Sequence, residues 1–290
     1  MALSAIITGL GLGSMYGLLA LGYHLTYAVS RTVNFAQGAT MMLGAVLCFT
    51  FWVTAGVPLA LSIVLALICC GIWGWAVERV AVRPFVKMKS DAWLMATVAL
   101  GIVLENVVLF TFGKDPRGMP TGVLTTSAIE IGSLHVQLLQ LIIPVAGLLL
   151  AISIQLFFRT TRLGKVSLAV MQNAEAARLM GIRVQRVISA SFALSGVLAG
   201  IAGVLISPLF SISSTMGTLF GIKAFAVAIL GGIGNAWGVV LAGLLYGLME
   251  AGIISAFGSA SSQILGFGLV ILVLWISPNG LFGRASVRKV

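Results

Sequence analysis

Three ionisable side chains stand inside or at the edge of long apolar stretches: Glu105, Glu250 and Lys223. A charge in such a setting is costly, so it marks a substrate pathway, an ion pathway or a proton relay by default. A relay needs a chain of titratable groups, and the apolar stretches hold too few of them. We therefore do not expect transport coupled to protons.

Each of these charges also has a simpler interpretation. Glu105, beside Asn106, would lie near the outer end of its apolar stretch, where water solvates it. Glu250 would form a buried polar pair that fixes how helices pack. Lys223 opens a short apolar stretch and is expected at the outer interface. The sequence leaves both interpretations open for the two acids.

Uncharged polar residues next to glycine form a first candidate for a solute pathway at Asn34, Gln37 and Gly38. Amide side chains offer hydrogen-bond donors and acceptors without a charge, which suits a polar solute in transit. The alternative is a helix cap followed by a tight turn. We weigh the two equally.

A second candidate pathway is a glycine-rich break at Gly231, Gly232 and Asn235. Non-helical backbone at membrane depth is tolerated only where protein or a cavity lines it. The break is therefore predicted to expose backbone groups to a passage.

No arrangement for catalysis or metal binding is evident. Cys48, Cys69 and Cys70 lie within apolar runs without a CxxC or histidine partner. His24 and His135 have no Cys, His or acidic neighbour at ligand spacing, so we interpret both as structural or interfacial. The chain has no HExxH motif, no paired Asp and no Ser–His arrangement, and it lacks the GxxxxGK[ST] phosphate-binding loop.

Composition indicates that lipid surrounds most of the chain. Of 290 residues, 60% are hydrophobic and 8% are charged, whereas a soluble domain is about 45–50% apolar and about 25% charged. The apolar runs are long and continuous, which favours membrane helices over a barrel with its short alternating strands. The predicted fold class is all-α, a polytopic helical bundle.

We expect eight or nine membrane spans in a single transmembrane domain over residues 1–290. The first apolar segment is too long for a signal-peptide core and is interpreted as a retained span. The segment 220–233 is short and is a candidate half-helix or broken span. The predicted apolar segments are 2–28, 38–55, 58–80, 92–112, 137–158, 187–207, 220–233, 236–256 and 260–277.

The placement of basic residues predicts the topology. The formal charge is +10, and most of the basic residues fall in segments 78–91 and 159–186 and in the C-terminal tail (Arg284, Arg288 and Lys289). Such segments lie in the cytoplasm, so the N-terminus is predicted outside and the C-terminus inside. No aromatic-interleaved basic face suggests nucleic acid. The loop 113–136 would be external, with a small hairpin within 123–136.

Glycine is dense in the predicted spans, with 35 residues in the chain. Small residues four apart allow membrane helices to approach closely. Packing is the favoured interpretation, and a narrow passage between close helices is the alternative. The repeating glycines are Gly9, Gly13 and Gly17, then Gly196, Gly200 and Gly203, then Gly243 and Gly247.

The segment 159–186 is predicted to hold a short cytoplasmic helix. Residues 166–180 have helical character with a modest apolar face at Leu168, Met171, Ala174 and Leu179, and Gly181 is a plausible stop. Such a helix either lies among lipid headgroups or docks into a groove of a cytoplasmic partner. Physical chemistry alone does not separate the two.

Four segments, in order, carry a family resemblance. Glu175-Ala176-Ala177 followed by Gly181 resembles the EAA-type loop of permeases in ATP-binding-cassette (ABC) importers. The wider segment 159–195 is similar to the branched-chain amino acid permease group, as are VNFAQG (33–38), KAFAVAILGGIGN (223–235) and SPNGLFG (277–283). The group commonly has histidine where this chain has Gln37, a difference that bears on substrate rather than fold.

The resemblance implies the membrane-spanning subunit of an importer for branched-chain or other hydrophobic amino acids in the bacterial inner membrane. Its implied partners are a second homologous permease, two cytoplasmic ATPase subunits, a periplasmic substrate-binding protein and membrane lipid. ATP and Mg²⁺ would bind the ATPase subunits, with no cofactor on this chain. Coupling to the ATPase is expected at Glu175, Ala176, Ala177, Arg178 and Gly181.

Other functions stay open. A permease of the same family could carry urea or short amides instead of amino acids. A secondary transporter or channel that works alone is a second alternative. A membrane-embedded enzyme is the weakest, because the spans lack a catalytic arrangement.

Overall fold

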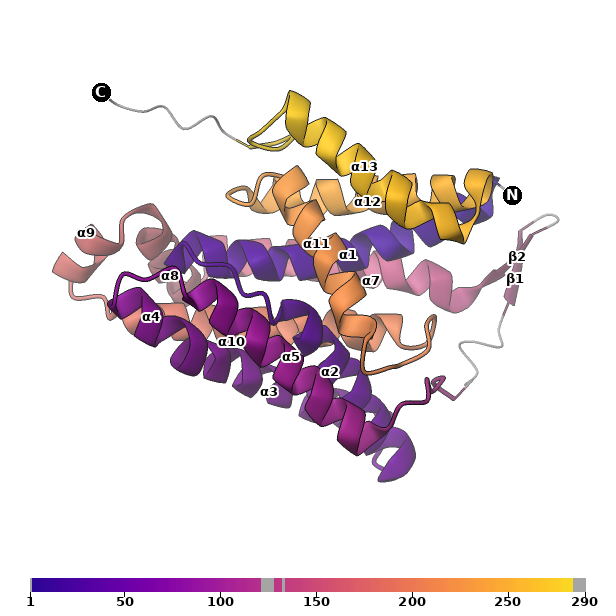
Figure 1. Cartoon of the computed structure of the whole chain (residues 1–290), viewed down its shortest axis with the longest axis horizontal. Coiled ribbons are helices and arrows are strands. Elements are labelled where there is room, and N and C mark those ends of the chain that lie inside the picture. Colours follow the sequence, from indigo (N-terminus) through magenta and orange to yellow (C-terminus); the bar gives the residue numbers. More distant parts are fainter. Residues whose placement is uncertain (1, 121–127, 132–133, 284–290) are drawn as a thin grey trace. The chain divides into compact units, whose positions relative to one another are not determined.

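The computed structural model describes residues 2–120, 128–131 and 134–283 (Figure 1), with side chains described over 5–120 and 141–283. The first half contains α1 (Ala2–Ser30), α2 (Gln37–Phe49), the π-helical turn η1 (Thr50–Thr54), α3 (Leu59–Val77), the π-helical turn η2 (Glu78–Val82), α4 (Arg83–Lys87) and α5 (Trp93–Phe112). The second half contains β1 (Ala128–Ile131), β2 (Leu134–Gln137), α7 (Leu138–Thr160), α8 (Arg162–Gln172), α9 (Ala174–Leu179), α10 (Val184–Ile206), α11 (Met216–Leu230), α12 (Ala236–Phe257) and α13 (Ser259–Ile276).

The prediction of a polytopic helical bundle is confirmed. In the described part of the chain, eight helices are long and apolar enough to cross a membrane. The remaining predicted segment, 220–233, corresponds to α11, which has only 15 residues. At 1.5 Å per residue it spans roughly 22 Å, less than the hydrocarbon core of about 30 Å.

The loop predicted to be external contains the small hairpin that its β-branched residues suggested. Strands β1 and β2 pair antiparallel, with Ala128 opposite Gln137 and Ile131 opposite Leu134. The predicted hairpin residues 123–127 and 132–133 lie outside the described part of the chain, as do Arg284, Arg288 and Lys289 of the predicted cytoplasmic tail.

The helices form two compact units. Unit 1 comprises residues 1–24, 122–151 and 223–290, and unit 2 comprises residues 25–121 and 152–222. The chain passes from one unit to the other four times, within α1, α7 and α11 and between residues 121 and 122. The prediction of a single domain over the whole chain stays a prediction.

In unit 2, α10 packs against α2 and α3 through glycine (Figure 1). A Cβ atom on Gly44 would lie 2.6 Å from the Cα of Gly200, and one on Gly196 would lie 3.2 Å from the Cα of Gly74. These distances leave no room for a side chain. The packing interpretation of Gly196 and Gly200 is therefore confirmed.

In unit 1, α1 and α12 cross at a similar glycine seam. A Cβ atom on Gly243 would lie 2.6 Å from the Cα of Gly17, and one on Gly9 would lie 2.9 Å from the carbonyl oxygen of Gly247. The repeat of glycine every four residues thus brings two backbones into contact.

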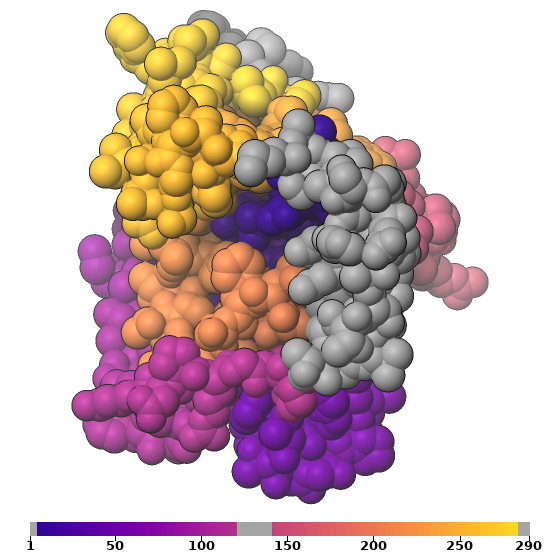
Figure 2. Space-filling view, turned by 90° about the vertical axis from the view of Figure 1, so that its right-hand side faces the viewer, coloured from indigo at the N-terminus to yellow at the C-terminus, as the bar shows by residue number. Residues whose placement is uncertain are grey.

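The outer surface of unit 1 is apolar along α13, which packs against α12. Figure 2 shows the end of α12 and the start of α13 in yellow. Large apolar side chains on α13 are exposed, including Ile264, Ile271 and Trp275. Such a surface is suited to lipid.

Candidate functional site

The predicted cytoplasmic helix is two helices rather than one. The backbone of Asn173 is extended and separates α8 from α9. Its side-chain oxygen accepts hydrogen bonds from the backbone N–H groups of Glu175 and Ala176, both at 3.0 Å. Asn is among the best N-cap residues, so the continuous helix expected over 166–180 is wrong at this residue.

The short helix α9 is anchored by one side chain and exposes most of the others. Ala177 is buried against Val29, Val170 and Val184. Glu175, Ala176 and Arg178 are exposed. Gly181 follows with φ of +80°, a conformation that glycine adopts without strain, and the helix ends there as predicted.

Two large apolar side chains at the end of α9 project away from the protein. Leu179 is 89% exposed and Met180 is 83% exposed. Leu179 was expected on one apolar face with Met171 and Ala174, and of these three only Met171 and Ala174 contact the buried cluster. The break at Asn173 changes the helical phase, so Leu179 does not share the packed face of Met171 and Ala174.

The first candidate pathway lies at the start of α2 in unit 2. Asn34 and Gln37 are fully buried. The side-chain oxygen of Asn34 accepts from the N–H of Ala36 at 3.1 Å. Gln37 donates to the carbonyl of Ser195 at 3.0 Å and accepts from the hydroxyl of Ser195 at 2.9 Å. The amide of Gln37 thus joins α2 to α10.

Gly38 brings α2 against the first turns of α11. A Cβ atom on Gly38 would lie 2.8 Å from the Cα of Gly221, and one on Gly217 would lie 2.6 Å from the carbonyl oxygen of Gly38. The structure therefore accounts for Asn34, Gln37 and Gly38 as packing residues. Their role in a solute pathway stays a prediction.

The second candidate pathway lies in unit 1, between α11 and α12, and is closely packed against the segment 277–283. The N–H of Leu281 donates to the carbonyl of Leu230 at 2.7 Å. Asn235, which precedes α12, donates from its side chain to the carbonyl of Phe282 at 3.0 Å. A Cβ atom on Gly232 would lie 2.7 Å from the backbone of Gly283. Two of the resembling segments thus form one structural unit.

His24 of α1 contacts the same glycine-rich break, between α11 and α12. Its Nδ1 lies 2.7 Å from the carbonyl oxygen of Ile233, so Nδ1 is the donor in this contact. The structural interpretation of His24 is confirmed. The side chain of His135 lies outside the described part of the chain.

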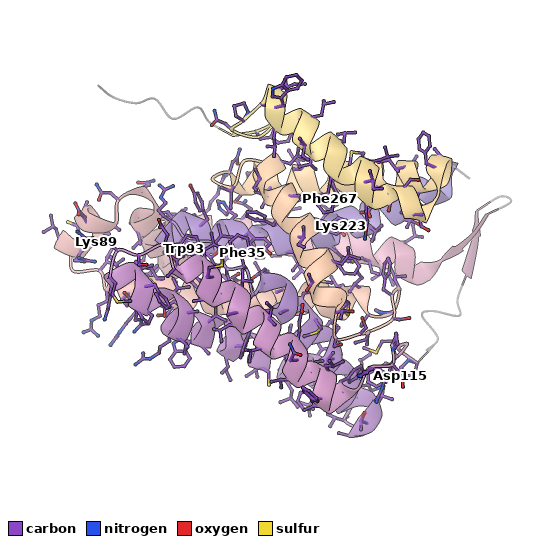
Figure 3. The ribbon with its side chains drawn as sticks, viewed as in Figure 1. Phe35, Lys89, Trp93, Asp115, Lys223 and Phe267 are labelled. Carbon is purple, nitrogen blue, oxygen red and sulfur yellow. The ribbon has the colours of Figure 1, made fainter. Side chains whose placement is uncertain are left out.

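A buried ionic cluster joins three helices of unit 1. Lys223, midway along α11 (Figure 3), pairs with Glu250 of α12. The hydroxyl of Tyr16 on α1 donates to the other carboxylate oxygen of Glu250 at 2.8 Å. Each of the three residues, counted with its backbone, is at most 5% exposed. The buried pair proposed for Glu250 is confirmed, whereas the interfacial position expected for Lys223 is wrong because that ammonium is enclosed by protein.

One hydroxyl beside this cluster has no partner. The ring of Tyr246 packs edge-on against Tyr16, with the centroids 5.5 Å apart. Its hydroxyl is buried without a hydrogen bond in the described part of the chain. This hydroxyl is therefore an unsatisfied polar group next to the cluster.

Glu105 is a different case. Its carboxylate accepts a hydrogen bond from the hydroxyl of Thr218 in a contact open to solvent, which agrees with an easily solvated position. Asn106 beside it donates to the carbonyl of Ile102 on its own helix at 2.8 Å.

A second ionic cluster, in unit 2, was not found from the sequence. Glu78 is fully buried at the end of α3 and forms a two-bond ion pair with Arg83, at 2.8 and 3.1 Å. Gln185 and Ser189 of α10 donate to the same carboxylate at 2.6 and 2.9 Å. We call these four residues the Glu78 clamp. A lone acid at the end of an apolar run was the only signal in the sequence.

Comparison with known proteins identifies the family. The family model described as the permease component of branched-chain amino acid transport systems matches residues 5–274. The high-affinity branched-chain amino acid transport system permease protein LivH of Salmonella typhimurium is 31% identical, over 99% of this chain and 97% of its own length. The corresponding protein BraD of Pseudomonas aeruginosa is 33% identical, over 99% of this chain and 98% of its own length.

One solved structure supports the same architecture. PsaBC from Streptococcus pneumoniae, in complex with Fab, is similar with a TM-score of 0.51 at 14% identity, over 95% of this chain and 91% of that chain. At that identity the similarity concerns the fold. The family match and the two relatives carry the assignment: the chain is a multi-pass membrane protein that belongs to the family of permease components of branched-chain amino acid transport systems.

Proposed function

We propose that this chain is the membrane-spanning subunit of an ABC importer that moves branched-chain or other hydrophobic amino acids across the cell inner membrane. The family and its relatives support the transport class. The observation that carries the coupling to ATP is α9, a short helix that is anchored by Ala177 and otherwise exposed.

The side chains of α9 suit a protein groove. Leu179 and Met180 are almost fully exposed beside Glu175 and Arg178. A helix that presents apolar anchors flanked by charge is a common way to fill a groove on a partner. We assign the groove to a cytoplasmic ATPase subunit, which binds ATP and Mg²⁺. The complete importer would contain two such subunits, a second homologous permease and a periplasmic substrate-binding protein.

The Glu78 clamp gives α9 a mechanical connection to the spans of unit 2. Gly181 ends α9, and α10 starts at Val184. Within the first two turns of α10, Gln185 and Ser189 donate hydrogen bonds to Glu78 at the end of α3. A displacement of α9 would thus move α3 and α10 together. Closure of the ATPase subunits on ATP supplies the displacement in this proposal.

Contacts within unit 1 support termini on opposite sides of the membrane, and the basic residues of segments 78–91 and 159–186 favour a cytoplasmic C-terminus. His24, near the end of α1, contacts Ile233 just after α11. Leu281, after α13, bonds to Leu230 at the end of α11. The end of α1 and the end of α13 therefore lie on the same side. If α11 and the residues before it complete one crossing, the chain crosses nine times and its two ends lie on opposite sides.

The substrate pathway is expected to be mostly apolar and to bind weakly, with selectivity set largely by the binding protein. Asn34, Gln37 and Gly38 and the break at Gly231, Gly232 and Asn235 are our candidates for its lining. These residues are closely packed in the present conformation, so the proposal requires that transport opens these contacts.

The coupling role is tested by Glu175→Lys in the reconstituted importer. Charge reversal on an exposed residue should leave the fold intact but weaken docking, so leucine uptake and substrate-stimulated ATP hydrolysis should both fall at least roughly tenfold, as for the loss of about 1.4 kcal/mol. Asp91→Lys is the matched control, because Asp91 is another exposed acid of unit 2 outside α9. Normal uptake and normal stimulation in Glu175→Lys would overturn the docking role.

The substrate is tested separately by competition. Leucine, isoleucine and valine should compete with one another for uptake by the same importer, whereas urea and short amides should not. Uptake of urea without competition by leucine would place the chain among permeases for small amides.

A further inference from the structure

An open pocket lies where α3 and η2 meet the start of α10, within unit 2. Its volume is about 450 Å³. Three of its lining residues are arginines and the rest are neutral. The lining is Trp75, Arg79, Arg83, Gln185, Arg186, Ser189, Ala190 and Ala193.

The pocket carries uncompensated positive charge. Arg83 is paired with Glu78 in the clamp. Arg79 lies over the ring of Trp75, 5.5 Å from its centroid, and it forms no ion pair with any described residue. Arg186 is exposed and likewise has no carboxylate partner in the described part of the chain. Two guanidinium groups are thus available to an anion.

An apolar stripe leads along α3 to this pocket. Leu61, Val64, Ile68 and Ile72 are each about half exposed, and they recur every three or four residues on one face of the helix. Trp75 continues the stripe at 44% exposure, and Arg79 follows one turn later. Apolar residues, then tryptophan, then arginine is the order in which a membrane helix meets acyl chains, the interface and the headgroups.

The opposite wall of the pocket is shallow. Ala190 and Ala193 of α10 face the pocket with only a methyl group each. A Cβ atom on Gly71 would lie 3.1 Å from Val197, so α3 and α10 approach closely just beyond the alanines. The small side chains of Ala190 and Ala193 thus leave the pocket open on the side of α10.

We propose that this pocket binds the phosphate headgroup of an anionic phospholipid, with Arg79 and Arg186 on the phosphate and an acyl chain along the stripe of α3. Arginine binds phosphate oxygens in a bidentate manner, and basic pockets between membrane helices on the cytoplasmic side take such headgroups. A free phosphate compound would use the arginines but not the apolar stripe. With the orientation proposed above, the lipid belongs to the cytoplasmic leaflet.

The lipid would sit against the Glu78 clamp, since Arg83, Gln185 and Ser189 line the same pocket. Anionic lipid would therefore bind next to the contact that joins α10 to α3. A lipid in this position would therefore affect how a displacement of α9 is transmitted to the membrane-spanning helices.

The test uses the purified importer in detergent, titrated with phosphatidylglycerol and with phosphatidylcholine, and native mass spectrometry to count bound lipids. Arg79→Gln with Arg186→Gln should weaken phosphatidylglycerol binding roughly 30-fold, about fivefold for each cation near an anionic lipid, and leave phosphatidylcholine unchanged. Arg159→Gln with Arg162→Gln is the control. It removes the same charge from exposed positions of unit 2 outside the pocket, and it should change the affinity by less than about twofold.

A second variant keeps the charge and fills the space. Ala190→Phe should also reduce phosphatidylglycerol binding, because the ring would occupy the groove between α3 and α10. If Ala190→Phe binds as the wild type does, or if both arginine pairs reduce binding equally, there is no defined pocket site. Displacement of the lipid by millimolar glycerol 3-phosphate would assign the pocket to a soluble phosphate compound and overturn the lipid assignment.

Discussion

The two units are stabilised by the same two kinds of contact between helices. In each, glycines bring two helices into backbone contact, and a buried carboxylate about one turn further on joins the helices through hydrogen bonds. Glu250 follows Gly247 on α12 and bonds to Tyr16 of α1. Glu78 follows Gly74 at the end of α3 and bonds to Gln185 and Ser189 of α10.

The units differ in where the balancing cation lies. Arg83 is five residues from Glu78 and its side chain is 20% exposed, so water reaches it. Lys223 comes from a third helix, and its side chain is only 7% exposed. A buried charge without its partner is far more costly than a charge that water can reach. Removal of one partner of the ion pair should therefore lower the free energy of unfolding much more in unit 1 than in unit 2.

The largest effect is expected for Lys223→Met. The substitution leaves the buried carboxylate of Glu250 without its cation, which should lower the free energy of unfolding by about 3–5 kcal/mol. Chemical denaturation of the purified protein in detergent measures the change. Lys223→Met with Glu250→Leu should recover most of the loss, because an apolar pair replaces the ionic one. A double variant as unstable as the single one would show that the ion pair is not the cause.

The next effect comes from the glycine seam of unit 1. The new methyl group of Gly243→Ala would lie 2.6 Å from the backbone of Gly17, so the helices must separate, at a cost of about 2 kcal/mol. Gly252→Ala on the same helix is the matched control. No atom lies within 4 Å of the Cβ that Gly252 would gain, and this variant should be equally stable or up to about 1 kcal/mol more stable. If Gly243→Ala and Gly252→Ala destabilise the protein equally, close packing of α1 against α12 is not the cause.

A smaller effect is expected for Glu78→Gln in the clamp. The amide keeps one acceptor for Gln185 or Ser189, and water can solvate Arg83, so the loss should be about 1–2 kcal/mol. Hydrogen exchange at the first turns of α10 should rise, because their tie to α3 is weakened. A loss as large as that of Lys223→Met would refute the distinction between the two units.

The smallest effect on stability belongs to α9. Leu179→Ser with Met180→Ser changes two exposed side chains, so the unfolding free energy should shift by less than about 0.5 kcal/mol. Uptake by the assembled importer should nevertheless fall, because the apolar anchors of the docking helix are lost. Unchanged uptake would leave α9 without a docking role.

The sequence predicted the features that depend on local pattern. Long apolar runs indicated membrane helices, and glycine spacing indicated close packing. The partner of Lys223 and the partners of Glu78 on α10 could not be predicted, because they lie 27 and more than 100 residues away in the sequence, on other helices. The sequence of a uniformly apolar helix also gives little indication of which face packs against the other helices. Asn173, by contrast, is a local signal. A search for N-cap residues over 166–180 would detect the break between α8 and α9.

We propose that this chain transports only as part of an ATP-driven importer. Uptake of labelled leucine should be measured in vesicles that hold this chain alone and in vesicles that also hold the second permease and the ATPase subunits, each with binding protein present. We predict ATP-dependent uptake in the complete vesicles and none with the chain alone. Leucine uptake by the chain alone, without ATP, would contradict the account.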